Sequence, residues 1–312
     1  MKICLFKTKL TPRGKQLINL LANGIRICGD ESFTISPIGN FPLSKHRRDK
    51  NTKNIINNIQ QTNAVVIFGG FPKFFNFKRY TEISFRSEIA HYAKKYGKKL
   101  LIIDTAFISD NMKFVSLGFS GIKNQGIYYN KNSPADRFEK LNAPLFPVSD
   151  NLNTANKILV FGQNKRGVSC QGIETHKWHI ETIKQLHNLT NKAIIFRRHP
   201  REKYTQPKKD FPSYVKFSTA TLDNALKNTY AAVGYSSNAL CHSLRLGLHT
   251  FSLGENAITY AITNNDINKI NMPIIYPEKE IRQFFYNLAY AEWSLDELEN
   301  GVAWQNFRQF VP

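Results

Sequence analysis

The sequence has no long hydrophobic run. No stretch of its 312 residues approaches the roughly 18 consecutive apolar residues that a membrane-spanning helix requires. The apolar opening at residues 2–6 is also too short to be a secretory signal. We therefore expect a soluble, cytoplasmic protein. With 42% hydrophobic residues the chain can bury a large core, and its length favours two domains.

Cysteine is scarce and scattered. The residues Cys4, Cys28, Cys170 and Cys241 lack the close spacing of a zinc clip, a redox motif or a disulfide framework. We predict ordinary thiols and no metal site.

Acidic residues are few relative to basic ones. The chain has 43 Lys and Arg against 23 Asp and Glu, a formal net charge of +20. Such a field favours polyanionic partners such as nucleic acid, an anionic membrane surface or an acidic glycan. A Lys- and Asn-rich composition from an AT-rich genome would raise the charge equally, with no binding role.

Apolar strands alternate with helical patterns in the first half of the chain. Residues 2–6, 64–68 and 99–103 are continuous apolar strands, and helical periodicity occurs around residues 17–21 and over 82–95. Strands that are apolar throughout are typical of a parallel sheet covered on both faces. This half therefore predicts a Rossmann-like lobe.

A loop-rich stretch at about residues 130–156 precedes a second α/β pattern. We predict an acceptor lobe at 1–140, a nucleotide lobe at 141–285 and a helical tail at 286–312. Two Rossmann-like lobes would place their ligand loops at the carboxyl ends of the strands, facing a central cleft. The strands expected in the second lobe are residues 157–162, 193–196, 214–217, 230–233 and 249–253.

The first candidate ligand motif is an Arg-Arg-His-Pro sequence that follows a buried strand. Pro200 disfavours helix at His199 and so fixes a loop where open sheets bind ligands. Arginines there can bind phosphate with two hydrogen bonds, and His199 can bind phosphate or ribose. Because adjacent residues on an extended segment point to opposite sides, Arg197 and Arg198 are not both expected to reach the ligand. A solvated basic turn explains the motif equally well.

Small polar residues follow another predicted strand. Ser236, Ser237 and Asn238 are typical of a helix start, where backbone amides carry partial positive charge suited to a diphosphate. They could also serve only as caps.

Two further strand ends carry weaker signals. Glu255 could accept hydrogen bonds from a ribose. Gly162 and Gln163 open a polar loop that matches neither the Walker pattern nor G-x-G-x-x-G, so a plain loop explains it as well.

In the first lobe, Asp104 ends a buried strand and is expected to face the cleft. A carboxylate there can deprotonate a hydroxyl group as a general base. An N-cap or a structural ion pair is the alternative role. The acids Glu82, Glu88 and Asp110 are reserve candidates.

Several segments resemble a known family. They are residues 103–108 and 116–121, the Arg-His-Pro loop, the Ser-Ser-Asn helix start and the tail at 290–304. Together they resemble the Kdo-transferase-like glycosyltransferases of capsule and lipopolysaccharide synthesis and their phage-encoded relatives. In the capsule enzymes an acidic pair precedes a Gly-Phe step, where this chain has Asp104, Thr105 and Ala106 before Phe107.

The resemblance implies a GT-B fold and a metal-independent transferase. It places a UDP- or CMP-linked sugar on the second lobe and the acceptor on the first, with no other cofactor. The Asp-x-Asp pair of many metal-dependent transferases is missing from the sequence, which agrees with phosphates neutralised by arginines and helix N-termini.

The resemblance alone implies a surface-glycan acceptor, whereas the charge favours DNA. Basic residues occur in a run at 45–53 and among phenylalanines at 73–80, which suits phosphate contact and base stacking. The phenylalanines could instead pack between the lobes, with the lysines solvated. We hypothesise transfer to a hydroxymethylated base of phage double-stranded DNA; surface-polysaccharide synthesis and a non-catalytic DNA-binding protein are the alternatives. The candidate DNA contacts are Arg47, Arg48, Lys73, Lys78 and Arg79.

Overall fold

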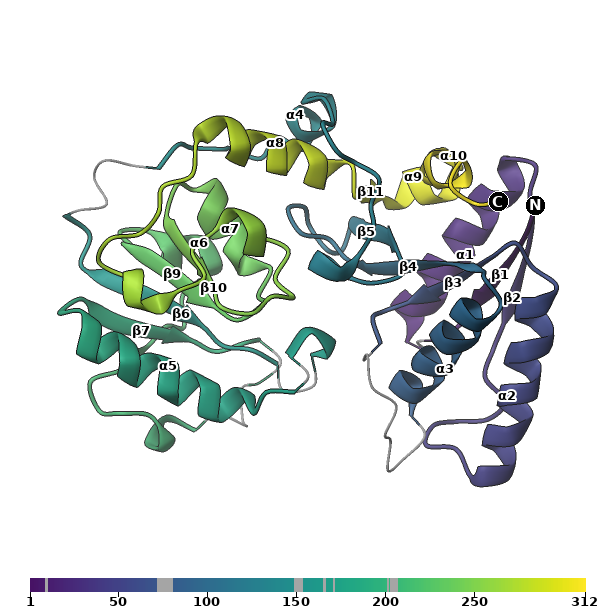
Figure 1. Cartoon of the computed structure of the whole chain (residues 1–312), viewed down its shortest axis with the longest axis horizontal. Coiled ribbons are helices and arrows are strands. Elements are labelled where there is room, and N and C mark those ends of the chain that lie inside the picture. The colour runs from purple at the N-terminus through teal and green to yellow at the C-terminus, as the bar shows by residue number, and fades with distance from the viewer. Residues whose placement is uncertain are drawn as a thin grey trace. The chain divides into compact units, whose positions relative to one another are not determined.

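The chain forms two compact units. The computed structural model describes residues 1–8, 11–71, 81–148, 154–164, 167–170, 172–200, 202 and 207–312. Unit 1 consists of Met1–Lys131 and Leu288–Pro312, and unit 2 of Asn132–Asn287 (Figure 1). The sequence placed a boundary at residue 140 and set 286–312 apart as a tail, whereas the structure includes almost all of that tail in unit 1.

Unit 1 contains a six-stranded sheet in the order β11-β5-β4-β3-β1-β2. Its first four strands along the chain are parallel, and β5 and β11 add two antiparallel strands at one edge. The strands are β1 (Lys2–Phe6), β2 (Glu31–Ile35), β3 (Ala64–Phe68), β4 (Lys99–Thr105), β5 (Phe114–Phe119) and β11 (Glu292–Ser294).

Helices cover both faces of this sheet. One face packs against α1 (Pro12–Ile27), α9 (Leu295–Glu299) and α10 (Val302–Arg308). The other packs against α2 (Lys45–Gln60) and α3 (Glu82–Lys95). Alternate residues of each central strand enter the two cores, which explains why the strands are apolar throughout.

The C-terminal segment completes unit 1 through close backbone contact. A Cβ atom on Gly24 of α1 would lie 2.1 Å from the carbonyl oxygen of Leu298 in α9, so only glycine permits this approach. The Trp304 indole N–H donates to Asp30 at 2.8 Å in the buried interior. These contacts are between residues more than 270 positions apart, which is why local sequence patterns assigned the segment to a separate tail.

The basic run at residues 45–53 forms the first half of α2. The buried positions of this helix are Asn51, Ile55 and Ile59, spaced by four, so a single narrow stripe packs against the sheet. Because the rest of the helix is Lys-, Arg- and Asn-rich, its apolar periodicity is weak and the sequence analysis missed it.

Unit 2 contains a five-stranded, fully parallel sheet in the order β10-β9-β6-β7-β8. Numbered from its first strand, this is the 3-2-1-4-5 order of Rossmann folds. The predicted fold class of two Rossmann-like lobes is therefore confirmed. The strands are β6 (Lys157–Phe161), β7 (Ala193–Arg197), β8 (Lys216–Phe217), β9 (Ala231–Gly234) and β10 (His249–Ser252). The helices are α4 (Asp136–Lys140), α5 (Thr175–Leu189), α6 (Leu222–Leu226), α7 (Ala239–Arg245) and α8 (Glu278–Ala289), which leads into unit 1.

Candidate functional site

The strand order of unit 2 reverses between β6 and β9. Open α/β sheets bind ligands at such a switch point, outside the carboxyl ends of the strands. Gln163 follows β6 there and Ser236 follows β9, and both are buried, at 4% and 1% exposure. Two residues chosen from the sequence thus lie where the topology predicts a ligand.

A short 3-10 turn, η3 (Val168–Cys170), contacts the residues that follow both strands. The Cys170 thiol lies 3.5 Å from Gln163 Oε1 and 3.5 Å from Ser236 Oγ. The Ser236 hydroxyl donates to Ser169 Oγ at 2.9 Å, and Asn256 Nδ2 donates to the Ser169 carbonyl at 3.2 Å. We call these five residues the strand-end cluster.

Sequence reasoning missed three members of this cluster. Ser169 and Asn256 were not singled out, and Cys170 was taken for an ordinary loop residue. Their positions beside Gly167 and Glu255 were the available signal, but only the fold brings the two loops together. The result is a neutral, largely buried network of hydroxyl, amide and thiol groups, in which Ser169 and Asn256 are partly exposed.

Gly162 and His199 meet through their backbones. The Gly162 N–H donates to the Arg197 carbonyl at 2.7 Å, and a Cβ atom at Gly162 would lie 2.8 Å from the His199 nitrogen. Any side chain at position 162 would push the His199 loop away from β6. The glycine therefore fixes His199 beside the strand-end cluster.

The two arginines preceding His199 have contacts elsewhere. Arg197 donates to the Ala220 carbonyl, and Arg198 Cζ lies 4.6 Å from the centre of the Phe217 ring on β8. Two strands separate β8 from β9, and at about 4.8 Å per strand spacing this is roughly 14 Å. We had expected the Arg198 guanidinium to lie near Ser236. The structure does not bring these two groups together.

The start of α7 is less suited to binding phosphate than predicted. The helix has only seven residues, so the partial charge at its N-terminus is small. The Ser237 hydroxyl accepts from the Ala239 N–H at 3.2 Å, whereas Asn238 makes no side-chain cap hydrogen bond. Ser237 thus caps the first amide of α7, and the polar groups of the strand-end cluster come instead from Ser236, η3 and their neighbours.

Glu255 is exposed at the end of the loop after β10, next to Asn256 of the strand-end cluster. Burial, followed by the charges of Cys170 and Glu255, raises the pKa of Tyr235. A Cβ atom on Gly254 would lie 2.7 Å from the Tyr235 ring, so the aromatic side chain packs directly on this loop. Glu255 therefore lies near the switch point and is accessible.

Behind the cluster, a buried histidine supports the loop after β6. His179 on α5 is fully buried, and its Nε2 accepts the Gln163 N–H at 2.8 Å. Burial, with a smaller effect of nearby His176, lowers the pKa of His179 to about 3. The ring is therefore neutral at physiological pH, as its acceptor role requires.

We expect this histidine to make the stability of unit 2 depend on pH. Between the native pKa of about 3 and the ordinary value of 6.5, the unfolded chain binds a proton that the native chain does not, so stability falls as pH decreases through this window. At pH 5 the loss is about 2 kcal/mol relative to pH 7.5. In urea unfolding at both pH values, the loss of stability should be about 2 kcal/mol larger for the unaltered chain than for His179→Gln, because His242 and His249, whose pKa values burial also lowers, contribute in both proteins. Equal pH dependence in the two proteins would contradict the assignment.

In unit 1, the candidate base Asp104 is half-buried near the end of β4. Burial lowers the pKa of Arg86 on α3, while the charges of Glu82 and Asp104 oppose that shift. A Cβ atom on Gly69, after β3, would lie 3.0 Å from the Arg86 guanidinium. The buried Arg86 guanidinium thus lies at the carboxyl ends of β3 and β4, which fits Asp104 either as a base or as an ion-pair partner.

The reserve acids are less suitable as bases. Glu88 is buried and accepts a hydrogen bond from the Thr52 hydroxyl. Asp110 Oδ1 accepts the Met112 N–H at 2.8 Å within a turn. Glu82 lies in the first turn of α3, and its charge opposes the lowering of the Arg86 pKa. Asp104 therefore stays the preferred candidate.

The proposed DNA contacts can be placed only in part. Arg47 and Arg48 lie on the exposed surface of α2. Lys73, Lys78 and Arg79 lie outside the described residues. Within the described ranges, no group of three or more His, Cys, Asp or Glu side chains could hold a metal ion. None of the helices seen in those ranges has the length and apolarity needed to cross a membrane.

No protein-family model and no curated protein sequence matches the chain. Similar solved structures include KpsC β-Kdo transferases of Thermosulfurimonas dismutans. The 2,4 transferase is 14% identical and covers 93% of this chain and 90% of its own, with a TM-score of 0.49. The 2,7 transferase is 13% identical, and the match covers 98% of this chain and 99% of the transferase, also with a TM-score of 0.49. MurG of Acinetobacter baumannii is 11% identical over 99% and 98%, with a TM-score of 0.34. The two KpsC structures are of the kind that the sequence resembles.

Proposed function

We propose that this chain is a glycosyltransferase that moves a sugar from a nucleotide-sugar donor to a hydroxyl acceptor. The observation that carries the proposal is the strand-end cluster at the switch point of unit 2. Hydroxyl, amide and thiol groups from three strand ends and η3 converge there, beside His199. The partly exposed groups, Ser169, Asn256 and the adjacent His199, can bind the ribose and phosphates of a nucleotide by hydrogen bonds.

In the proposed reaction, Asp104 of unit 1 accepts the proton of the acceptor hydroxyl group. The acceptor oxygen then forms a bond to the anomeric carbon of the sugar. The bond from that carbon to the donor phosphate breaks, and its electron pair leaves with the nucleotide. His199 and the cluster would stabilise the departing phosphate by hydrogen bonds. We propose that no metal ion takes part, so transfer should persist in excess EDTA.

The donor is tested by offering UDP- and CMP-linked sugars and measuring product masses. Replacing the imidazole in His199→Ala should weaken binding of the matching free nucleotide about tenfold, because one hydrogen bond to a charged group is lost. Calorimetric titration with CMP and with UDP measures this. His187→Ala is the matched control, since His187 is exposed and stacks on Tyr214 at 3.8 Å. Equal affinities in the two variants would place the nucleotide elsewhere.

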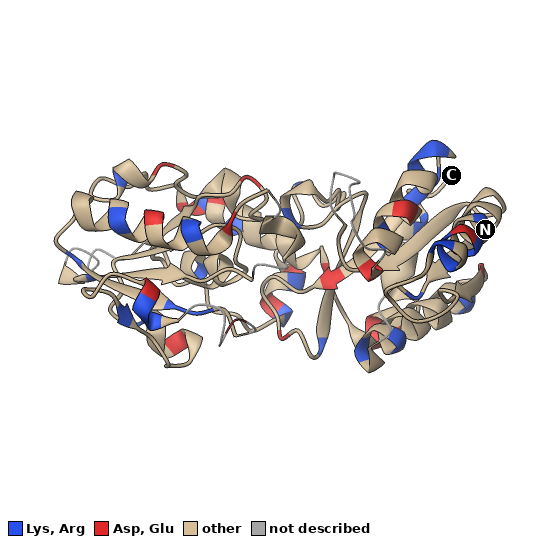
Figure 2. Cartoon of the chain, turned by 90° about the horizontal axis from the view of Figure 1, so that it is seen from below, with Lys and Arg blue, Asp and Glu red and all other residues tan. Residues whose placement is uncertain are grey.

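For the acceptor we propose a hydroxymethylated base in double-stranded DNA. The exposed surface of α2 supports this, because it carries five basic residues against the acidic Asp49. Lys and Arg also occur on helices of both units (Figure 2), so the total charge by itself does not locate a binding surface. The basic residues of α2 are Lys45, Arg47, Arg48, Lys50 and Lys53.

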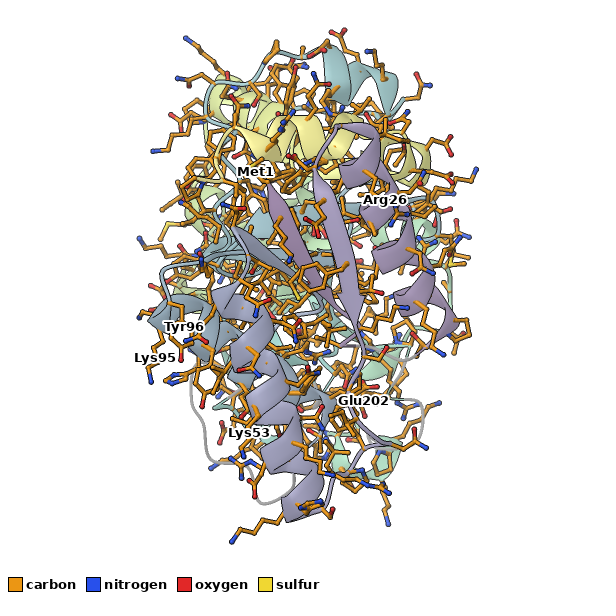
Figure 3. All side chains as sticks on the ribbon, turned by 90° about the vertical axis from the view of Figure 1, so that its right-hand side faces the viewer. Met1, Arg26, Lys53, Lys95, Tyr96 and Glu202 are labelled. Carbon is orange, nitrogen blue, oxygen red and sulfur yellow. The ribbon has the colours of Figure 1, made fainter. Side chains whose placement is uncertain are left out.

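Neighbouring groups extend this basic surface onto α3. Lys53 and Lys95 are exposed on the two adjacent helices (Figure 3), and Lys95 Nζ lies 5.8 Å from the centre of the Tyr96 ring. Basic and aromatic side chains together suit nucleic-acid contact. Affinity for duplex DNA should fall steeply with salt. No DNA retention at low salt, with product formed on a surface glycan instead, would replace DNA by the polysaccharide acceptor.

A further inference from the structure

Three polar side chains form one row across the apolar sheet of unit 1. Asp104 on β4 is directly opposite Ser116 on β5, and Ser116 is directly opposite Glu292 on β11. Residues directly opposite on antiparallel strands project from the same face of a sheet. We call Asp104, Ser116 and Glu292 the polar row.

The residues flanking the polar row show which face it occupies. Ile103, Val115 and Trp293 all belong to the core that packs against α1. Because side chains alternate along a strand, the polar row lies on the opposite face, the side covered by α3. Arg86 of α3, whose pKa is affected by the charge of Asp104, is on this same side.

Glu292 connects the C-terminal segment to the loop that follows Asp104. Its side chain is 1% exposed. Its Oε1 accepts the N–H groups of Phe107 and Ile108, the latter at 2.5 Å, and its Oε2 accepts the Ser109 N–H at 3.1 Å. A buried carboxylate is costly unless it is hydrogen-bonded, and buried amides need acceptors. The two groups therefore satisfy each other.

Ser116 fixes the residue between Asp104 and this loop. Its hydroxyl donates to the Thr105 carbonyl at 3.0 Å. The chain leaving Asp104 is thus held at Thr105 by β5 and at residues 107–109 by β11. Little freedom is left at the end of β4.

We propose that Glu292 is a positioning residue which, with Ser116, holds Asp104 in the orientation needed to accept a proton. The inference rests on the proposed function, since it assigns Asp104 the role of base. Glu292 touches no reacting atom. It acts through the backbone of residues 107–109 on the side chain three positions before them.

The test compares Glu292→Gln with Glu297→Gln. The first puts an amide N–H₂ group among three backbone N–H donors and removes an acceptor. The second alters the same segment, where Glu297 Oε2 accepts the Ser294 N–H at 2.8 Å, and leaves the loop after Asp104 untouched. Both variants should keep the folded state, which circular dichroism and thermal unfolding check.

Glu292→Gln should lower kcat at least about tenfold and leave KM for the nucleotide sugar unchanged, because the donor binds unit 2. Amide hydrogen exchange should accelerate about tenfold or more at one or more of residues 107–109 in this variant, because glutamine keeps only one of the two oxygens that accept these N–H groups. Glu297→Gln should change neither quantity. A purely structural role would instead lower the stability of Glu292→Gln, with kcat falling only in proportion to the folded fraction.

Three further outcomes would contradict the positioning role of Glu292, and one of them also counts against the proposed function. Faster exchange at residues 107–109 with an unchanged kcat would overturn the positioning role alone. Equal losses of kcat in the two variants would overturn it as well. Absence of transfer by the unaltered chain with every donor and acceptor would count against the proposed function, and the positioning role would fail with it.

Discussion

Asp104→Asn should abolish sugar transfer almost completely while leaving nucleotide binding intact. The amide has the size of the carboxylate but cannot accept the hydroxyl proton, and loss of a general base typically costs about 10² to 10⁴ in rate. We expect kcat to fall about a thousandfold. Because the proposed donor site lies in unit 2, the affinity for CMP or UDP should stay within about twofold. Product mass for turnover, and calorimetry for binding, give the two quantities separately.

Asp110→Asn is the matched control for that substitution. Asp110 is exposed six residues further on, and its carboxylate serves a turn. This variant should transfer sugar at the unaltered rate. If Asp104→Asn keeps more than about a tenth of the activity, the base lies elsewhere. If the unaltered chain and both variants bind nucleotide but never transfer sugar, the chain is a binding protein.

Gly24→Val should destabilise unit 1 by about 3 kcal/mol or more. The Cβ atom would lie 2.1 Å from the Leu298 carbonyl oxygen and 3.0 Å from the Gly301 nitrogen, and both of these are backbone atoms. No side-chain rotation relieves such a contact, so α1 and α9 must separate. For a unit of this size the unfolding midpoint should fall by roughly 6 to 12 °C.

Asn19→Ala provides the comparison for Gly24→Val. Asn19 is exposed on the same helix, where alanine has the higher helix propensity. Its midpoint should stay level or rise slightly. Calorimetric scans of the two variants are sufficient for this test. A fall of less than about 1 kcal/mol for Gly24→Val would show that α9 is not packed against α1 in solution.

The sequence predicts the two sheets well because their signals are local. Residues 64–68 and 158–161 are continuous apolar runs flanked by helical patterns, and both form central parallel strands. The edge strand β11 of the sheet in unit 1 could not be predicted from such a local signal. Strand β11 has only three residues, and its pairing with β5 joins segments that lie far apart in the sequence, such as Glu292 and Ser116.

The candidate site shows the same difference between residues with a local sequence signal and residues that only the fold brings together. Gln163, His199 and Ser236 were chosen from the sequence because each lies two residues after a strand, where topology alone favours ligand contact. Ser169 lies in a turn whose path the sequence does not specify, and Asn256 joins the site through its hydrogen bond to the Ser169 carbonyl. Arg198 was misplaced because sequence order does not reveal that the Phe217 ring on β8 would take its guanidinium.

Interruption of unit 1 by unit 2 has a consequence for the order in which the protein folds on the ribosome. The N-terminal strands emerge first, but β11, α9 and α10 are synthesised only after all of unit 2. At about 5 to 20 residues per second, this delay is roughly 10 to 30 s. Until then Trp304 and Phe307 do not cover the α1 face, and β5 is an open sheet edge. The nascent chain is therefore most exposed to aggregation, and most in need of chaperones, while unit 2 is being made.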